Sequence, residues 1–219
     1  MAEHGAAALS LRAIARQMGL TAPALYRYFG DRDALVTALI VEAFNALADS
    51  LTAAGEAPAG ASLAARLWAI GLAYRDWALA HPQDYLLIFG TPIPGYHAPA
   101  EITGPAAKRS FDVLVAALQS LRGGRRPRLS RAFQSAPAGL QAQVEAWRQR
   151  YGYALGGEGL LFALETWTRM HGLVSLELVG QIEPFFGEAG ELYRLEIRKI
   201  LEEAGLRPDV VEGTKGSRK

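Results

Sequence analysis

The chain contains no cysteine, which excludes disulfide bonds, thiolate metal sites and a cysteine nucleophile. It has no uncharged apolar run of about 18 residues, and its N-terminus lacks the pattern of a signal peptide. Charge is also scarce, because only 21% of the residues are charged and the net charge is +1. We therefore expect a soluble, cytoplasmic protein without a membrane span, in which any affinity for a polyanion depends on a local patch.

The common motifs of catalysis are missing as well. The sequence has no HExxH, no phosphate-binding GK[ST] and no GxSxG, and its four histidines lie far apart. The glycines at 156–159 are not a dinucleotide fingerprint, since no strand precedes them and the GxGxxG spacing is absent. The sequence predicts a protein that is not an enzyme and that has no metal site and no cofactor.

Apolar residues are abundant and recur at helical spacing. They make up 50% of the 219 residues, which is ample for a core in one large domain or two small ones. The apolar periodicity predicts an all-α fold. The expected helices cover residues 31–52, 62–81, 82–90, 108–121, 140–153, 158–179 and 188–204.

Residues 10–35 have the spacing of two short helices joined by a tight turn. Ser10 is a good N-cap for the first helix, Gly19 permits the turn, and Thr21 can cap the second helix. This is the spacing of a helix-turn-helix, which carries its second helix into the DNA major groove. Four arginines against one acid between Ser10 and Arg32 give the sign of charge that suits DNA. An ordinary helical hairpin with solvated polar faces has the same spacing.

The same stretch resembles the DNA-binding segment of the TetR family of bacterial transcriptional repressors. The match runs without a gap through Ser10-Leu-Arg-x-Ile-Ala, Gly19-Leu-Thr-x-Pro-Ala-Leu-Tyr-Arg-Tyr-Phe and Asp31-Arg-Asp-Ala-Leu. The resemblance implies a ligand-responsive regulator, most often a repressor, that binds a palindromic operator as a homodimer. It also implies which residues contact double-stranded DNA: Ser10 and Arg12 from the first helix, Thr21, Ala22, Pro23 and Ala24 at the bases, Tyr26 and Tyr28 at the backbone, and Arg32 at a flanking phosphate.

The start of the chain departs from the family pattern. A TetR-like domain has another helix before the helix-turn-helix, and only residues 2–5 look like the end of that helix. We therefore expect an N-terminally truncated DNA-binding bundle, with its first helix largely missing and part of its core absent.

Two irregular segments interrupt the C-terminal half. Residues 91–105 contain four prolines and two glycines, so we expect an irregular segment that lies over a cavity or packs as a surface loop. Residues 122–138 are rich in arginine, which fits a solvated loop or a second nucleic-acid contact. The helix expected from Leu140 is predicted to end at Gly156 and Gly157.

The last two predicted helices, residues 158–179 and 188–204, are the most apolar. The first is apolar nearly all round, which indicates that it is buried on more than one side. Both helices are expected to pair with their copies in a homodimer, as a four-helix interface. The first also resembles the signature of the WHG-type C-terminal domain of TetR proteins through Trp167, His171 and Gly172.

In TetR-like proteins this half holds an inducer pocket, so the resemblance implies one here. Aromatic or polar side chains on otherwise apolar helices are the candidates for its wall: Tyr74, Trp77, Phe89, Tyr96, Phe111, Trp167 and His171. Each of them also fits a core position, and His171 also fits a hydrogen-bonded core or interface histidine. Such a lining would suit a hydrophobic or aromatic small molecule.

The sequence therefore predicts three parts. Residues 1–48 form the helix-turn-helix domain, residues 49–207 form a larger helical ligand-binding and dimerisation domain, and residues 208–219 form a disordered tail. The alternative is a helical adaptor that binds only protein. An adaptor would explain the apolar helices but not the helix-turn-helix, and it would have no salt-dependent affinity for DNA.

Overall fold

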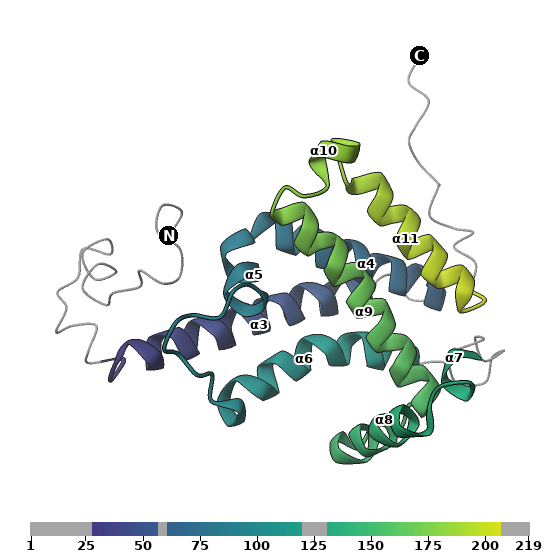
Figure 1. Ribbon diagram of the computed structural model, residues 1–219, viewed down its shortest axis with the longest axis horizontal. Coiled ribbons are helices and arrows are strands. Elements are labelled where there is room, and N and C mark those ends of the chain that lie inside the picture. Colours follow the sequence, from purple (N-terminus) through teal and green to yellow (C-terminus); the bar gives the residue numbers. More distant parts are fainter. Residues whose placement is uncertain (1–27, 57–60, 120–130, 207–219) are drawn as a thin grey trace. The chain divides into compact units, whose positions relative to one another are not determined.

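The computed structural model describes residues 28–56, 61–119 and 131–206, and every regular element within these ranges is a helix (Figure 1). The all-α prediction is therefore confirmed. In chain order the helices are α3 (Arg32–Gly55), α4 (Leu63–Ala80), α5 (Pro82–Phe89), α6 (Ala100–Gln119), α7 (Arg131–Gln134), α8 (Ala138–Tyr151), α9 (Gly157–Leu178), α10 (Glu183–Phe186) and α11 (Gly190–Glu203).

Several helix boundaries follow the local signals in the sequence. The Asp31 side chain accepts a hydrogen bond of 2.7 Å from the Ala34 N–H, and Ser62 accepts one of 3.2 Å from the Ala65 N–H. These are N-caps of α3 and α4, since each satisfies a backbone donor that the first turn leaves unpaired. α4 ends at Ala80, one residue before the expected end at 81, because Pro82 disfavours the helical conformation of the residue before it.

The prediction of an irregular segment over residues 91–105 was wrong in its second half. α6 begins at Ala100 and contains Pro105. The carbonyl of Pro99 accepts hydrogen bonds of 3.0 Å from both the Ile102 and the Thr103 N–H groups, which starts the helix. Pro105 removes one donor near the helix start, but the buried Thr103 and Ala106 fix this turn against the core.

The predicted end of the helix at Gly156 and Gly157 was also wrong. α8 ends at Tyr151, and Gly152 takes a left-handed backbone conformation with φ of 66° while its N–H bonds to the Arg148 carbonyl. A glycine adopts this conformation without steric cost, so the first glycine after the helix stops it. Gly156 instead lies at the N-cap of α9, and Gly157 is the first residue of that helix.

The chain divides into two compact units. Unit 1 is formed by residues up to 49 together with 77–111, and unit 2 by residues 50–76 together with those from 112 onward. The α3, α4 and α6 helices each contribute residues to both units. The boundaries of the predicted domains stay a prediction.

The core of unit 1 is built on the first half of α3. Val36, Ile40 and Phe44 recur every four residues on one face of the helix and are buried. They pack with Ile93, from the segment before α6, and with Ala106 on α6. α3 is also the one described helix that is long and apolar enough to span a membrane by length and composition, a test that core helices of soluble proteins also pass.

The core of unit 2 is organised around α9, which contacts α7, α8 and α11 (Figure 1). Its buried residues lie on more than one side of the helix, as its all-round apolar sequence predicted. They are Gly159, Leu160, Leu161, Phe162, Ala163, Thr166, Met170 and Val174. α11 is amphipathic and buries one stripe, consisting of Gly190, Tyr193, Ile197, Ile200 and Leu201.

Candidate functional site

The described residues include two of the nine predicted DNA contacts. Tyr28 is 82% exposed and Arg32 is the first residue of α3, next to the Asp31 cap. Both are therefore placed where a partner could reach them. The other seven, Ser10, Arg12, Thr21, Ala22, Pro23, Ala24 and Tyr26, lie outside the described residues.

The first turns of α3 are held by a polar contact with the segment before α6. The Thr37 hydroxyl donates to the Asp33 carbonyl at 2.8 Å, and the Tyr96 hydroxyl lies 2.9 Å from the same Thr37 oxygen. Because the single proton of Thr37 is used on Asp33, Tyr96 is the donor of the second bond. Together with the buried Ile93, this bond ties the segment 90–99 to the helix that follows the predicted DNA-binding head.

The structure places the seven predicted pocket residues in two groups. Tyr74, Trp167 and His171 belong to unit 2, whereas Trp77, Phe89, Tyr96 and Phe111 belong to unit 1. In unit 1 the rings of Phe89 and Phe44 meet edge to face at 5.6 Å between centroids, and Trp77 lies 5.5 Å from the His81 ring. These contacts are typical of core packing.

In unit 2, Tyr74 and Trp167 each contact His171. The Tyr74 hydroxyl on α4 lies 2.8 Å from Nδ1 of His171 on α9. One turn earlier on α9, the Trp167 ring stacks on the imidazole, with 5.0 Å between centroids and 27° between planes. Ser175 Oγ lies 3.4 Å from Nε2 on the other side of the ring. The structure thus assembles a polar group within an apolar helix contact.

The histidine in this group is uncharged near neutral pH. Burial lowers the pKa of His171 below its ordinary value of 6.5, because desolvation penalises the imidazolium. A neutral imidazole has one donor and one acceptor nitrogen, which suits a tyrosine hydroxyl on one side and a serine hydroxyl on the other. His171 is therefore a partly buried, hydrogen-bonded histidine, which fits the core or interface position that the sequence allowed for it.

Sequence reasoning missed a buried ion pair beside this group. Arg75 Nε and Nη2 donate to the two carboxylate oxygens of Glu177 at 2.8 and 2.5 Å, and their side chains are only 13% and 16% exposed. The Arg75 guanidinium also lies 5.9 Å from the centre of the Tyr193 ring. The bond to Glu177 raises the pKa of Arg75. The available signal was a charged residue within the apolar stripe of α4.

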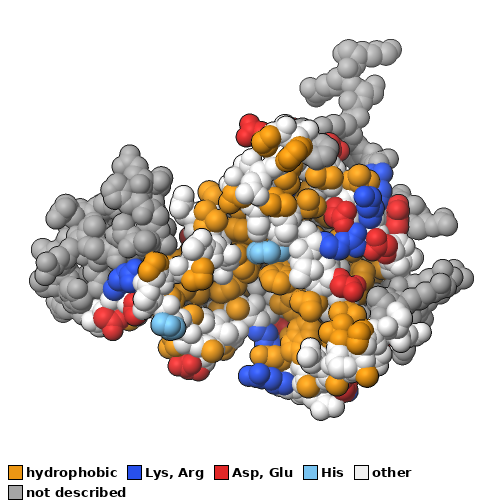
Figure 2. Space-filling model, viewed as in Figure 1, with side chains coloured by type: hydrophobic (Ala, Val, Ile, Leu, Met, Phe, Trp, Pro, Cys, Tyr) orange, Lys and Arg blue, Asp and Glu red, His pale blue; other side chains and the backbone are white. Residues whose placement is uncertain are grey.

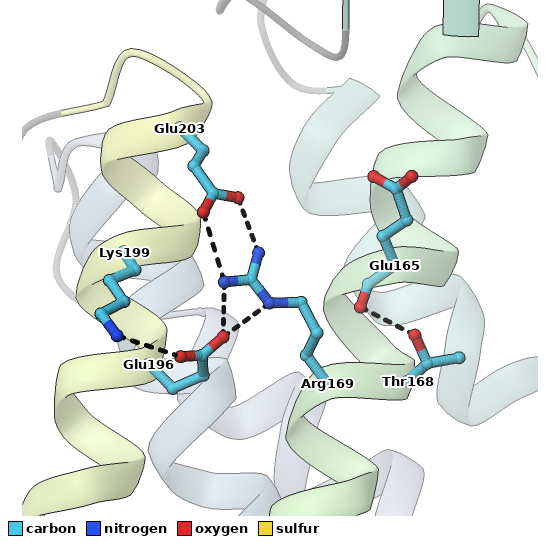
Figure 3. Close-up of polar contacts among 6 residues, drawn as sticks. All are labelled: Glu165, Thr168, Arg169, Glu196, Lys199 and Glu203. Carbon is cyan, nitrogen blue, oxygen red and sulfur yellow. Dashed lines mark hydrogen bonds and ion pairs between the residues drawn. The ribbon is translucent and has the colours of Figure 1, made fainter. Parts of the chain in front are cut away.

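A second charged network joins α9 to α11 (Figure 3). Arg169 donates from Nε to Glu196 at 2.6 Å and from Nη1 to Glu203 at 2.6 Å. Lys199 lies 3.9 Å from the second Glu196 oxygen. Figure 3 shows Glu165 on α9 pointing away from these contacts. Burial raises the pKa of Glu165.

In the described part of the chain no cluster of histidines and carboxylates could hold a metal ion.

Comparison with known proteins identifies the family. A family model described as bacterial regulatory proteins of the tetR family matches residues 1–39. A second, described as the tetracyclin repressor-like C-terminal domain, matches residues 67–200, more than half of the chain. The chain belongs to the TetR family of transcriptional regulators. The second match includes the Tyr74, Trp167 and His171 group.

Relatives of this TetR-family chain are named as HTH-type transcriptional regulators, and they match it over most of their length. The HTH-type transcriptional regulators Rv1816 of Mycobacterium tuberculosis and Mb1846 of Mycobacterium bovis are each 35% identical to it over 183 residues. The match covers 82% of this chain and 76% of each relative. These findings confirm the predicted class of a DNA-binding, helix-turn-helix transcriptional regulator.

Solved structures agree with this family fold. The crystal structure of the protein SCO4313 is 40% identical in sequence, covers 92% of this chain and 89% of its own, and superposes with a TM-score of 0.73. A protein of unknown function from Rhodococcus sp. RHA1 is 24% identical and has a TM-score of 0.64, over 94% of this chain and 88% of its own. The second likeness supports the fold alone.

Proposed function

We propose that this TetR-family regulator is a repressor that binds a palindromic operator as a homodimer and is released by a small hydrophobic or aromatic molecule. The observation that carries the proposal is the match of residues 1–39 to the DNA-binding family model. The exposed Tyr28, immediately before the capped start of α3, supports it. Its place of action is the cytoplasm, where bacterial DNA lies.

Each subunit presents residues 21–28 to one major groove of the operator. Thr21, Ala22, Pro23 and Ala24 are small enough to let the helix approach base edges, and tyrosine hydroxyls at 26 and 28 suit phosphate oxygens. Ser10, Arg12 and Arg32 supply the flanking contacts. The two heads must be about 34 Å apart to enter successive major grooves on one side of the duplex.

The homodimer forms through the outer faces of α9 and α11. Leu176 and Val179, at the end of α9, are 43% and 56% exposed, and Leu195 on α11 is 45% exposed. One turn before Leu176 on α9, Gly172 has no atom within 4 Å of the position that a Cβ would occupy, so a partner helix could approach closely. Figure 2 shows hydrophobic side chains where Figure 1 places α9, with charged side chains toward α11.

The inducer binds in the C-terminal domain. It favours a dimer whose two DNA-binding domains are not spaced to enter successive major grooves. Among the pocket candidates, Tyr74 and Trp167 both contact His171, and the three combine aromatic surface with neutral hydrogen-bonding groups. Trp77, Phe89, Tyr96 and Phe111 remain candidates for a pocket wall in unit 1. An inducer must bind the two dimer geometries with different affinity, because a ligand with equal affinity shifts nothing.

Operator binding is tested by fluorescence anisotropy with a labelled DNA fragment from upstream of the gene, using the full-length protein at two salt concentrations. We expect specific binding that weakens steeply with salt, since phosphate contacts release counterions. Tyr26→Ala should lower the affinity by about tenfold or more, while Tyr151→Ala, which removes an exposed tyrosine on α8, should leave it unchanged.

A helical adaptor gives the opposite result. It would show no salt-sensitive binding to any upstream fragment, and Tyr26→Ala and Tyr151→Ala would behave alike. Equal binding of Tyr26→Ala and the wild-type protein to a specific fragment would instead disprove the proposed docking of residues 21–28. Dimerisation is measured separately by sedimentation, so that loss of DNA binding is not confused with loss of the dimer.

A further inference from the structure

The exposed face of α11 carries one large apolar side chain between two charges of opposite sign. On the side away from the buried stripe of this helix, Leu195 is 45% exposed, more than any other large hydrophobic side chain of α11. The side chain of Glu191, four residues earlier, is 90% exposed. Arg198, three residues after Leu195, is exposed as well. An apolar side chain beside charges is the composition of an interface centre with a charged rim.

Glu191 and Arg198 lie in one row along this face. They are seven residues apart, which is nearly two turns of about 3.6 residues, so both side chains leave the helix on the same side of Leu195. The row therefore carries a negative charge toward the start of α11 and a positive charge toward its end. Figure 2 shows side chains of both charges where Figure 1 places α11.

The carboxylate of Glu191 has room for a second basic partner. Its Oε1 accepts a hydrogen bond of 2.8 Å from Arg194 Nη1, within the same helix. Its Oε2 makes no hydrogen bond or ion pair with any residue that the structure describes. A carboxylate can accept bonds on both oxygens, so this contact within α11 still allows Glu191 to bind another guanidinium.

The charge row is complementary to a second copy of itself in one orientation. A two-fold axis perpendicular to α11 relates it to an antiparallel copy. The negative end of each row then meets the positive end of the other, and two ion pairs form. An axis along the helices would make them parallel, and it would place Glu191 and Arg198 each against its own copy. Repulsion between like charges disfavours that arrangement.

We propose that the α11 helices of the homodimer pair antiparallel about a two-fold axis level with Leu195, and that Glu191 binds the partner's Arg198. This proposal rests on the homodimer proposed above, and it adds the orientation and register of the contact. The axis lies midway between positions 191 and 198, and α11 begins at Gly190, so residues 190–199 of the two helices face each other. Glu202 is exposed on the same face but lies beyond this overlap.

The test reverses charges in the full-length protein without DNA and measures the dissociation constant of the dimer by sedimentation at several concentrations. Glu191→Arg places two pairs of like charges across the axis, and so does Arg198→Glu. We expect each variant to raise the dissociation constant about tenfold or more at about 0.1 M salt. The effect should shrink at about 1 M salt, because ions screen exposed charges.

Mixing the two variants restores the proposed ion pairs. In a heterodimer of Glu191→Arg with Arg198→Glu, both contacts again join opposite charges, and native mass spectrometry identifies this heterodimer by its mass. We expect the heterodimer, and the homodimer of a chain that carries both changes, to dissociate within about threefold of the wild-type constant. This rescue also shows that each variant folds. Glu202→Arg is the matched control, since it makes the same charge change outside the overlap and should not weaken the dimer.

The proposed register is overturned, while the homodimer stands, if the wild type is dimeric and both charge reversals leave its dissociation constant unchanged. A mixture that dimerises as weakly as the single variants would also overturn it, since the two charges would then act without pairing. Equal weakening by Glu202→Arg and Glu191→Arg would show that overall charge, and not this pair, is responsible. A monomeric wild-type protein at micromolar concentration would overturn the homodimer and this contact together, and operator binding is measured separately by anisotropy.

Discussion

His171 and Tyr74 join α9 to α4 through a hydrogen bond of 2.8 Å between the imidazole Nδ1 and the phenol oxygen. The two residues are 97 positions apart in the sequence. Their bond places a titratable group at the helix contact that also carries the buried Arg75–Glu177 pair. Protonation of His171 should therefore change the stability of unit 2.

We predict that His171 makes the protein less stable in mild acid. Because burial lowers its pKa below 6.5, the folded protein binds this proton more weakly than the unfolded chain. The His171 contribution to stability is then fully present above about pH 6.5 and is lost as the pH falls through the lowered pKa. Urea unfolding of wild type and His171→Gln between about pH 5 and 7.5 measures it. Wild type should lose more stability than the variant, and parallel pH curves would contradict the prediction.

The Arg75–Glu177 pair should be costly to break on one side. We expect Arg75→Met to destabilise the protein by roughly 2 to 4 kcal/mol, because it leaves the Glu177 carboxylate buried without its two donors. The double variant Arg75→Met with Glu177→Leu should recover part of this loss, since no charge is then left unpaired. Denaturant unfolding of four proteins, namely the wild type, Arg75→Met, Glu177→Leu and the double variant, gives the coupling energy. A double variant as unstable as the sum of both single variants would show that the two residues act independently.

The Arg169 network should contribute less than the buried pair and should depend on salt. Arg169 bridges Glu196 and Glu203, but its side chain is 33% exposed and that of Glu203 is 60% exposed. We expect Arg169→Ala to cost about 1 kcal/mol at low salt and less at high salt, because solvent and ions screen exposed charges. Arg194→Ala is the control, since Arg194 forms a single exposed pair with Glu191 within α11. Equal losses in the two variants would show that bridging α9 and α11 adds nothing.

The segment before α6 should be held to α3 mainly by apolar packing. Ile93 is 7% exposed in the core of unit 1 with Val36 and Phe44, so Ile93→Ala should cost about 2 to 4 kcal/mol through the cavity that it creates. Tyr96→Phe removes only the hydrogen bond to Thr37, so we expect a loss of about 1 kcal/mol. Thermal unfolding of both variants shows which of them loses more stability. A larger loss for Tyr96→Phe would mean that the polar contact dominates.

The dimer should depend on the outer face of α9. We expect Val179→Asp and Gly172→Leu to shift the protein from dimer to monomer in sedimentation at micromolar concentration. The first would place a charge at the subunit contact, and the second would fill the space in front of Gly172. Ile102→Asp is the matched control, since Ile102 is 53% exposed on α6 in unit 1. Unchanged dimers in Val179→Asp and Gly172→Leu would exclude this face as the interface.

Local signals in the sequence determined most of the helices. Asp31 and Ser62 cap α3 and α4 at the starts expected for the helices 31–52 and 62–81, and the apolar period located α9 and α11. These features depend on residues within a few positions of one another, so they can be read along the chain. The resemblance of residues 10–35 to the TetR family was sufficient to assign the class of protein, which the comparisons confirm.

Tertiary contacts decided the rest. The burial of Ala106 against α3 keeps Pro105 within a helix that proline content argued against. The pairs Tyr74–His171 and Arg75–Glu177 join residues about a hundred positions apart, and no local pattern specifies which distant partner a polar side chain meets. The sequence by itself determined most of the helices and the family. Only packing between helices decided which charges are buried together, and which polar side chains, such as those of Trp68 and Thr166, have no hydrogen-bond partner among the described residues.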